Sequence, residues 1–307
     1  MKLSIVTTMY YSAPFVKEFY NRISLIATKI TKEYEIIFVD DGSPDSSLYE
    51  ALKLFEVDKK VKILQLSKNF GHHKAIMTGL LKAKGDYVFL IDLDLEEPPE
   101  ILLDFWDAMN KNDDADVIYG LQKTRKGSTF EKITGYIFWS LILKLSDLNI
   151  VRNQITCRLM KKNYVSSICL YKERELFFGG ISENVGFKQI GVYVEKQSKG
   201  SSTYSLKKKT SQMISAITSF SSTPLKLIFI FGALVSVFSL LFICYHLSLK
   251  FIFTKQYDEG WPSIILSIWL IGGLNFMFLG TIGIYISKIF TEVKKRPYSI
   301  IKKTYEK

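Results

Sequence analysis

The chain has 307 residues, with 41 Lys and Arg side chains against 30 Asp and Glu, which gives a formal net charge of +11. Hydrophobic residues make up 48% of the chain, so an intrinsically disordered protein is excluded. Three cysteines in no close pair exclude a disulfide scaffold and a Cys-rich zinc site, and three histidines do not suit a His-rich metal centre.

Residues 1–121 alternate between strand and helix patterns. Short apolar runs at 3–7, 35–39, 61–66, 87–91 and 117–119 predict strands, and stretches near 14–29, 45–56, 72–83 and 99–110 predict helices. This alternation favours an α/β fold with a mostly parallel sheet and helices on both faces. Ligands of such sheets bind beyond the carboxyl ends of the strands, so polar motifs at those ends are candidate site residues.

The first polar motif, Asp40-Asp41-Gly42-Ser43, follows the second predicted strand. It predicts an exposed turn whose two carboxylates accept hydrogen bonds from a nucleotide base N–H or from ribose hydroxyls. The alternative is a turn that starts the next helix, with Ser43 or Asp45 as its N-cap. These residues alone leave both interpretations open.

The second polar motif follows the fourth predicted strand and reads Asp92-Leu93-Asp94-Leu95-Glu96-Glu97-Pro98-Pro99. Strand alternation puts Asp92 and Asp94 on one side, where two carboxylates and a diphosphate can hold a divalent cation. Oxygen ligands favour Mg²⁺ or Mn²⁺ over zinc. A bare acidic turn is the alternative, but the position of the motif, in step with Asp40 and Asp41, favours a functional role.

Two uncharged apolar runs, 227–249 and 262–287, predict membrane-spanning helices, because about 20 apolar residues cross a bilayer core. Buried core helices are the alternative. The outer flanks of both runs are rich in Lys, so the positive-inside rule puts them in the cytoplasm and the short connection outside. A basic chain with such runs indicates a membrane surface and not nucleic acid.

Residues 207–223 predict an amphipathic interfacial helix just before the first apolar run. Lys207, Lys208 and Lys209 begin it and suit either a lipid phosphate or general attraction to anionic headgroups. Within the second run, Gly272, Gly273, Gly280 and Gly283 suit close helix packing in a hairpin or a homo-oligomer. A lipid-facing helix that merely tolerates glycine is equally compatible with them.

These motifs together resemble family 2 glycosyltransferases of the GT-A fold, and more closely the polyisoprenyl-phosphate glycosyltransferases and dolichyl-phosphate mannose synthase. The resemblance covers nearly the whole chain. It is carried by the two acidic motifs, by Gly85-Asp86, by the two-span C-terminus, and by the segments Leu66-Ser67-Lys68-Asn69-Phe70-Gly71, Gly186-Phe187, Thr218-Ser219-Phe220-Ser221 and Pro224-Leu225.

The resemblance implies roles for individual residues. Asp40 and Asp41 would read the nucleotide, most often uridine, with Asn69 and the pair His72-His73 in the same cleft, although surface positions on a helix suit the histidines as well. Asp92 and Asp94 would hold Mg²⁺ or Mn²⁺ on the diphosphate of the donor, with Asp94 counted as catalytic. Glu96 stands near the metal where relatives often have Gln, which adds a negative charge.

On the acceptor side, the resemblance puts Arg125 and Lys126 in a loop that covers a donor or acceptor phosphate. The alternative is that this basic loop is simply solvated. Arg158 could bind a phosphate in bidentate fashion, or instead pair with Glu173 or Glu175. Many relatives carry an Asp where Thr156 stands here. A sugar hydroxyl needs a base to accept its proton, whereas a lipid phosphate is already anionic, so the change favours a phosphate acceptor.

The sequence therefore predicts four regions: a GT-A domain at 1–205, a juxtamembrane helix at 206–224, two membrane helices within 225–290, and a basic cytoplasmic tail at 291–307. The predicted reaction is inverting, metal-dependent transfer from a UDP-sugar to undecaprenyl phosphate at the cytoplasmic membrane face, for surface polysaccharide decoration. Direct transfer to a glycan or glycolipid, and an inactive membrane scaffold, are the alternatives. The sequence does not identify the sugar.

Overall fold

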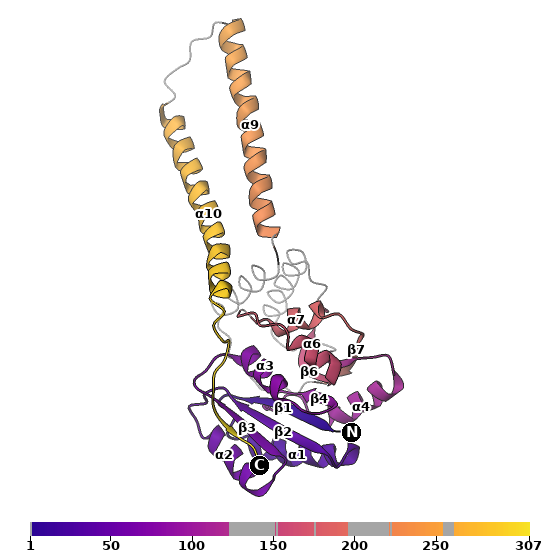
Figure 1. Ribbon diagram of the computed structural model, residues 1–307. Coiled ribbons are helices and arrows are strands. Elements are labelled where there is room, and N and C mark those ends of the chain that lie inside the picture. Colours follow the sequence, from indigo (N-terminus) through magenta and orange to yellow (C-terminus); the bar gives the residue numbers. More distant parts are fainter. Residues whose placement is uncertain are drawn as a thin grey trace. The chain divides into compact units, whose positions relative to one another are not determined.

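The computed structural model describes residues 2–122, 151, 153–174, 176–195, 221, 223–253 and 261–307 (Figure 1). These residues divide into two compact units. The sheet unit holds the described residues up to 195 together with Arg296–Lys307, and the helix unit holds the described residues from 221 to 295.

A mixed sheet forms the centre of the sheet unit, with the strand order β7-β5-β6-β4-β1-β2-β3-β8. The neighbours β4, β1, β2 and β3 run parallel, whereas β6 and β8 run antiparallel to the strands beside them. The predicted α/β class with a mostly parallel sheet is thereby confirmed. The strands are β1 (Leu3–Met9), β2 (Tyr34–Asp40), β3 (Val61–Leu66), β4 (Tyr87–Leu90), β5 (Val117–Gln122), β6 (Gln154–Lys161), β7 (Gln189–Val194) and β8 (Ile301–Tyr305).

Helices cover both faces of this sheet (Figure 1). All four helices expected in the first half of the chain are present, and α6 and α7 are additional. The helices are α1 (Val16–Ile30), α2 (Ser47–Val57), α3 (His72–Lys82), α4 (Ile101–Lys111), α6 (Lys162–Ile168) and α7 (Phe178–Asn184).

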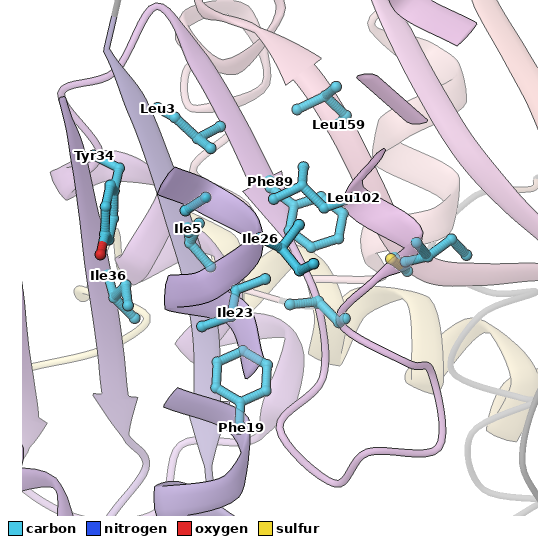
Figure 2. Packing of buried hydrophobic residues seen from close by; sticks show 14 of the residues in the cluster. Leu3, Ile5, Phe19, Ile23, Ile26, Tyr34, Ile36, Phe89, Leu102 and Leu159 are labelled. Atoms are coloured by element: carbon cyan, nitrogen blue, oxygen red, sulfur yellow. The ribbon is translucent and has the colours of Figure 1, made fainter. Parts of the chain in front are cut away.

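The main hydrophobic core lies between the sheet and helices α1, α2 and α4 (Figure 2). Alternate residues of the strands, such as Ile5, Ile36 and Phe89, point into it and meet Phe19 and Leu102 of the helices. Each is completely buried. Truncating a buried Phe to Ala typically lowers the free energy of unfolding by about 3–5 kcal/mol. This layer therefore holds the carboxyl ends of the strands in place.

Helix α3 packs on the opposite face of the sheet, and it does so through a glycine. A Cβ atom added at Gly79 would lie 2.5 Å from Val6 Cγ1 and 2.9 Å from Val39 Cγ2. Only glycine therefore lets α3 approach β1 and β2 this closely. The approach places the first turn of α3 beside the carboxyl ends of these strands.

The C-terminal residues form a strand that the sequence analysis did not predict. Within the region expected to be a basic tail, β8 pairs antiparallel with β3, with Leu66 opposite Ile301 and Ile63 opposite Tyr305. The sheet unit consequently includes Arg296–Lys307 as well as the N-terminal part of the chain.

The helix unit contains α9 (Thr223–Phe253) and α10 (Trp261–Val293). Among the described residues, Leu270–Val293 is long and apolar enough to cross a membrane, with a mean hydropathy of 1.6. Thr223–Val235 is a shorter apolar stretch. No described atom lies within 4 Å of a Cβ added at Gly272, Gly273, Gly280 or Gly283. These glycines therefore mark no close contact among the described residues.

Candidate active site

The two acidic motifs meet at the carboxyl edge of the sheet, on either side of β1. Asp40 is the last residue of β2 and stands opposite Met9 of β1. Asp92 follows β4, where the amide of Ile91 still donates to the carbonyl of Val6 in β1. Strand register thus brings the motifs to neighbouring positions, at the edge where open α/β sheets bind ligands.

Asp40 and Asp41 are buried, with exposed fractions of 2% and 3%, so the expectation of an exposed turn is wrong. The physical reason is the loop at 67–71, which closes over the turn. Phe70 N donates to Asp41 Oδ1 at 2.7 Å and Gly71 N donates to Asp41 Oδ2 at 3.0 Å. Burial raises the pKa of Asp41, while these two amide donors lower it.

Asp40 makes a different contact, since its Oδ1 accepts a hydrogen bond from Ser43 N at 3.1 Å. Burial also raises the pKa of Asp40, against the hydrogen bonds from Ser43. Neither Ser43 nor Asp45 is the N-cap of α2; that position is Ser46, which makes no side-chain capping bond. Asp40 thus has carboxylate lone pairs beyond those that Ser43 uses, since two carboxylate oxygens offer about four acceptor positions.

Gly42 explains how the loop can pack so closely. Its φ is +65°, and an added Cβ would lie 2.6 Å from the carbonyl carbon of Lys68 and 2.7 Å from Asn69 N. The backbone of the loop therefore occupies the space that any side chain at this position would need. Asn69 itself is exposed on this loop.

Asp92 and Asp94 flank Leu93, which is buried in the core at 2% exposure. Both carboxyl residues are partly exposed, but they lie in the turn after β4, which ends at Leu90, and not in the strand whose alternation was predicted to align them. The motif then turns sharply: Leu95 has a φ of +62°, and Glu96 N donates to Asp94 Oδ1 at 3.0 Å. In the described residues there is no group of three His, Cys, Asp or Glu side chains that could hold an ion by itself.

His72 connects two of the strand ends at this edge. Its Nδ1 lies 3.1 Å from Thr8 Oγ1, and its Nε2 lies 3.4 Å from Asp92 Oδ1. Because a carboxylate can only accept, we assign the hydrogen to Nε2, which leaves Nδ1 to accept from the Thr8 hydroxyl. Loss of hydration lowers the pKa of His72, although Asp41 and Asp94 raise it.

His73 faces another part of the chain. Its Nδ1 lies 3.0 Å from the carbonyl oxygen of Leu176, and its ring centroid lies 5.9 Å from that of Phe177. Burial lowers the pKa of His73 to about 4, so the ring is neutral near pH 7. Thr8, the partner of His72, was not among the predicted site residues. The position of Thr8 near the end of β1, between the two acidic motifs, is the signal that could have identified it.

Arg158, expected at a phosphate, is instead enclosed, with 1% of its surface exposed. Its guanidinium donates to the carbonyls of Thr156 at 3.2 Å and Ile155 at 3.4 Å, and it lies 4.6 Å from the ring centroid of Phe178. Burial lowers the pKa of Arg158, and Tyr164 opposes this shift. The structure therefore buries this side chain against Phe178 of α7, while its backbone pairs with Leu90, the last residue of β4.

Five of the predicted site residues lie outside the described residues, as does most of the predicted amphipathic helix at 207–223. The roles suggested for them from the sequence thus stay predictions. They are Arg125, Lys126, Lys207, Lys208 and Lys209.

Comparisons with known proteins agree on the family. Residues 4–169 match the model described as "Glycosyl transferase family 2". The chain is 45% identical over 305 residues to a Mycobacterium tuberculosis protein whose name places it among the glycosyltransferases, covering 99% of this chain and 89% of the relative. It is 35% identical to the uncharacterized glycosyltransferase YkcC of Bacillus subtilis, covering 99% and 94%.

A third relative carries a more specific name. The SfII prophage-derived bactoprenol glucosyl transferase of Shigella flexneri is 32% identical over 311 residues, covering 99% of both chains. The family model matches more than half of the chain, and these relatives align with nearly all of it. The chain therefore belongs to glycosyl transferase family 2 and is a glycosyltransferase.

Proposed function

We propose that this enzyme transfers a sugar from a UDP-sugar to a polyprenyl phosphate, undecaprenyl phosphate, at the cytoplasmic face of the cell membrane. The product would be a lipid-linked monosaccharide used to decorate a surface polysaccharide. The observation that carries the proposal is the similarity over 99% of both chains to a relative named for glucosyl transfer to bactoprenol.

The carboxyl edge of the sheet has the chemistry for the donor. Asp40 would accept hydrogen bonds from the uracil N–H or the ribose, since Ser43 N uses only part of its acceptor capacity. Asp41 has a different task, because both of its oxygens already accept backbone amides of the 67–71 loop. It would hold that loop, including the exposed Asn69, around the nucleotide.

Asp92 and Asp94 would hold Mg²⁺ or Mn²⁺ against the diphosphate, with Glu96 adding negative charge nearby. Their fit rests on two partly exposed carboxylates that both lie near His72, which pairs with Asp92 and interacts electrostatically with Asp94. Two carboxylates and substrate phosphates are a usual ligand set for Mg²⁺, which agrees with the lack of a three-residue cluster among the described residues. When bound, the ion would neutralise charge on the leaving diphosphate.

The transfer itself is a single displacement with inversion. An oxygen of the acceptor phosphate forms a bond to the anomeric carbon, and the bond from that carbon to UDP breaks, so UDP leaves with the electron pair. A phosphate monoester has a second pKa of about 6 and is anionic near pH 7, so no protein base is needed. Thr156 fits this requirement, because the family resemblance implies an acid at this position in many transferases and this chain has none there.

Membrane attachment would bring the lipid phosphate to the donor. Leu270–Val293 meets the length and hydropathy of a spanning helix. The described residues up to 195 belong to the sheet unit, those from 221 to 295 belong to the helix unit, and the chain is back in the sheet unit at Arg296. We infer that α9 and α10 cross the membrane as a pair, because an odd number of crossings would separate β8 from the rest of its sheet.

The proposal is tested by lipid extraction. Detergent-solubilised protein receives a panel of radiolabelled UDP-sugars, with and without polyprenyl phosphate, in Mg²⁺ or Mn²⁺. We expect label in the organic phase that requires both the metal and the lipid phosphate. Asp94→Ala should reduce the rate by about 100-fold or more, whereas Asp104→Ala, an exposed aspartate on α4, should not change it.

Other outcomes would contradict the proposal in distinct ways. Label that appears only on an added glycan or glycolipid would favour direct transfer. Absence of both transfer and UDP binding by a folded protein would favour the scaffold alternative. Full activity of Asp94→Ala would overturn the metal assignment while leaving the acceptor open.

A further inference from the structure

The C-terminal segment (Arg296–Lys307) reaches the catalytic sheet at its functional edge. Strand β8 runs antiparallel to β3, so it starts beside Leu66, where β3 ends, and finishes beside Ile63. The segment therefore joins the sheet at the carboxyl edge of β3. The loop at 67–71 begins at the same place.

Two hydrogen bonds join the start of this segment to the loop and to α3. Ser67 N donates to the carbonyl oxygen of Ile300 at 2.9 Å. Ser299 Oγ lies 2.7 Å from Thr78 Oγ1. Because the Thr78 hydroxyl donates to the carbonyl of Lys74, also at 2.7 Å, Ser299 must be the donor in the second bond.

The same loop holds the nucleotide-side turn. Three and four residues after Ser67, the amides of Phe70 and Gly71 bind the two oxygens of the buried Asp41. The loop also packs on Gly42 with no space for a Cβ. A displacement of Ser67 would consequently be transmitted to Asp41 through a short, closely packed backbone.

The other end of the segment is anchored separately. Glu306 pairs with Lys62 and, at 2.8 Å, with Lys84. Lys62 also contacts the buried Glu35 at 3.0 Å, and Lys307 Nζ donates to the carbonyl of Glu56 at 2.8 Å. These contacts fix β8 at its far end, so the segment is an integral part of the unit and not a loose tail.

We propose that the C-terminal segment is a positioning element for the donor site. It holds the 67–71 loop, and through that loop Asp41, in the arrangement that binds the nucleotide. This inference rests on the proposed function, in which Asp41 and its loop surround a uridine nucleotide.

The test measures UDP affinity in the presence of Mn²⁺, with amide exchange of residues 66–72 as an independent measurement. Ser299→Ala removes one hydrogen bond and should weaken UDP binding by about two- to fivefold. A chain truncated after Arg296 should bind UDP about tenfold more weakly or worse, because the bond to Ser67 and strand β8 are lost as well. Both variants should exchange Phe70 and Gly71 amides faster.

Two control variants separate positioning from general stability. Thr28→Val removes a threonine hydroxyl that bonds the Leu25 carbonyl on the surface of α1, and it should not change UDP affinity. Glu306→Gln weakens only the far anchor and should change it by less than about twofold. If the chain stopped after Arg296 does not fold, Ser299→Ala decides the question.

The outcomes are distinct. If neither Ser299→Ala nor truncation after Arg296 changes the UDP affinity, β8 is only structural and the inference is overturned. This holds even if either variant has a lower unfolding temperature. If the wild-type protein does not bind UDP, the proposed function is refuted. In that case the positioning role is judged from amide exchange alone, and exchange of residues 66–72 that is unchanged in Ser299→Ala would overturn it. A Thr78→Cys, Ser299→Cys disulfide should form within one chain, and a bridge between chains would contradict the intramolecular arrangement.

Discussion

Asp41 differs from its neighbour Asp40 because both of its carboxylate oxygens bind backbone amides of the same loop. An asparagine at this position would present an NH₂ group to one of those amides, leaving a buried donor without an acceptor. We expect Asp41→Asn to lower the free energy of unfolding by about 1–3 kcal/mol and to weaken UDP binding together with it. Urea unfolding and a UDP titration on one preparation measure both; a change in affinity alone would mean that Asp41 contacts the nucleotide directly.

His72 stands between Thr8 and Asp92, where it can fix the orientation of a proposed metal ligand. Groups that orient metal-binding side chains typically contribute about 10–100-fold to metal affinity. His72→Ala should therefore weaken Mn²⁺ binding by about tenfold in the presence of UDP, as measured by the paramagnetic resonance signal of free Mn²⁺. Thr8→Val, which leaves the ring in place, should have a smaller effect. Mn²⁺ affinity unchanged by His72→Ala would remove His72 from the metal site.

At the scale of elements, the anchoring of β8 should respond to acid. Hydrogen bonds from Lys62 and then from Lys84 lower the pKa of Glu306 from its ordinary value of 4.5 to about 2. Because the folded pKa is the lower one, this carboxylate stabilises the fold fully above pH 4.5, and the contribution disappears as the pH falls towards 2. The groups are partly exposed, so the contribution should be at most about 1 kcal/mol.

The measurement compares thermal unfolding of wild-type protein and Glu306→Gln across this pH range. The difference in unfolding temperature should be largest above pH 4.5 and should vanish as the pH approaches 2. The comparison between the two proteins cancels the titration of carboxylates that do not share Lys62 or Lys84 with Glu306. A difference that stays constant with pH would show that Glu306 does not hold the strand electrostatically.

Elements with a hydrophobic pattern of their own could be predicted from the sequence, and those stabilised by distant partners could not. Strands β1 to β4 and helices α1 to α4 each carry such a pattern. Strand β8 has the sequence Ile-Lys-Lys-Thr-Tyr, and most of its residues are exposed. It forms because β3 supplies its backbone hydrogen-bond partners. The pair Lys62–Glu306 joins residues that are 244 positions apart in the sequence. Likewise, the edge position of Asp40 and Asp41 follows from strand order, but their burial depends on the 67–71 loop.

For the whole molecule, the return of the chain to the sheet unit determines the membrane topology that we propose. With the native cysteines replaced, Lys255→Cys, between α9 and α10, should react with an impermeant maleimide in intact bacterial cells. Lys188→Cys, on the surface of the sheet unit, should react only after the cells are permeabilised. Labelling of both sites in intact cells, or of neither, would contradict a paired crossing.

The position of β8 at the end of the chain also has a consequence for biosynthesis. Ribosomes make β3 early, but its antiparallel partner emerges only after both long helices have been translated. Until then β3 has an unpaired edge, which is a site for aggregation or proteolysis. Completion of the catalytic sheet is thereby tied to translation of both α9 and α10, so prematurely terminated products should be recognised and degraded by quality-control proteases.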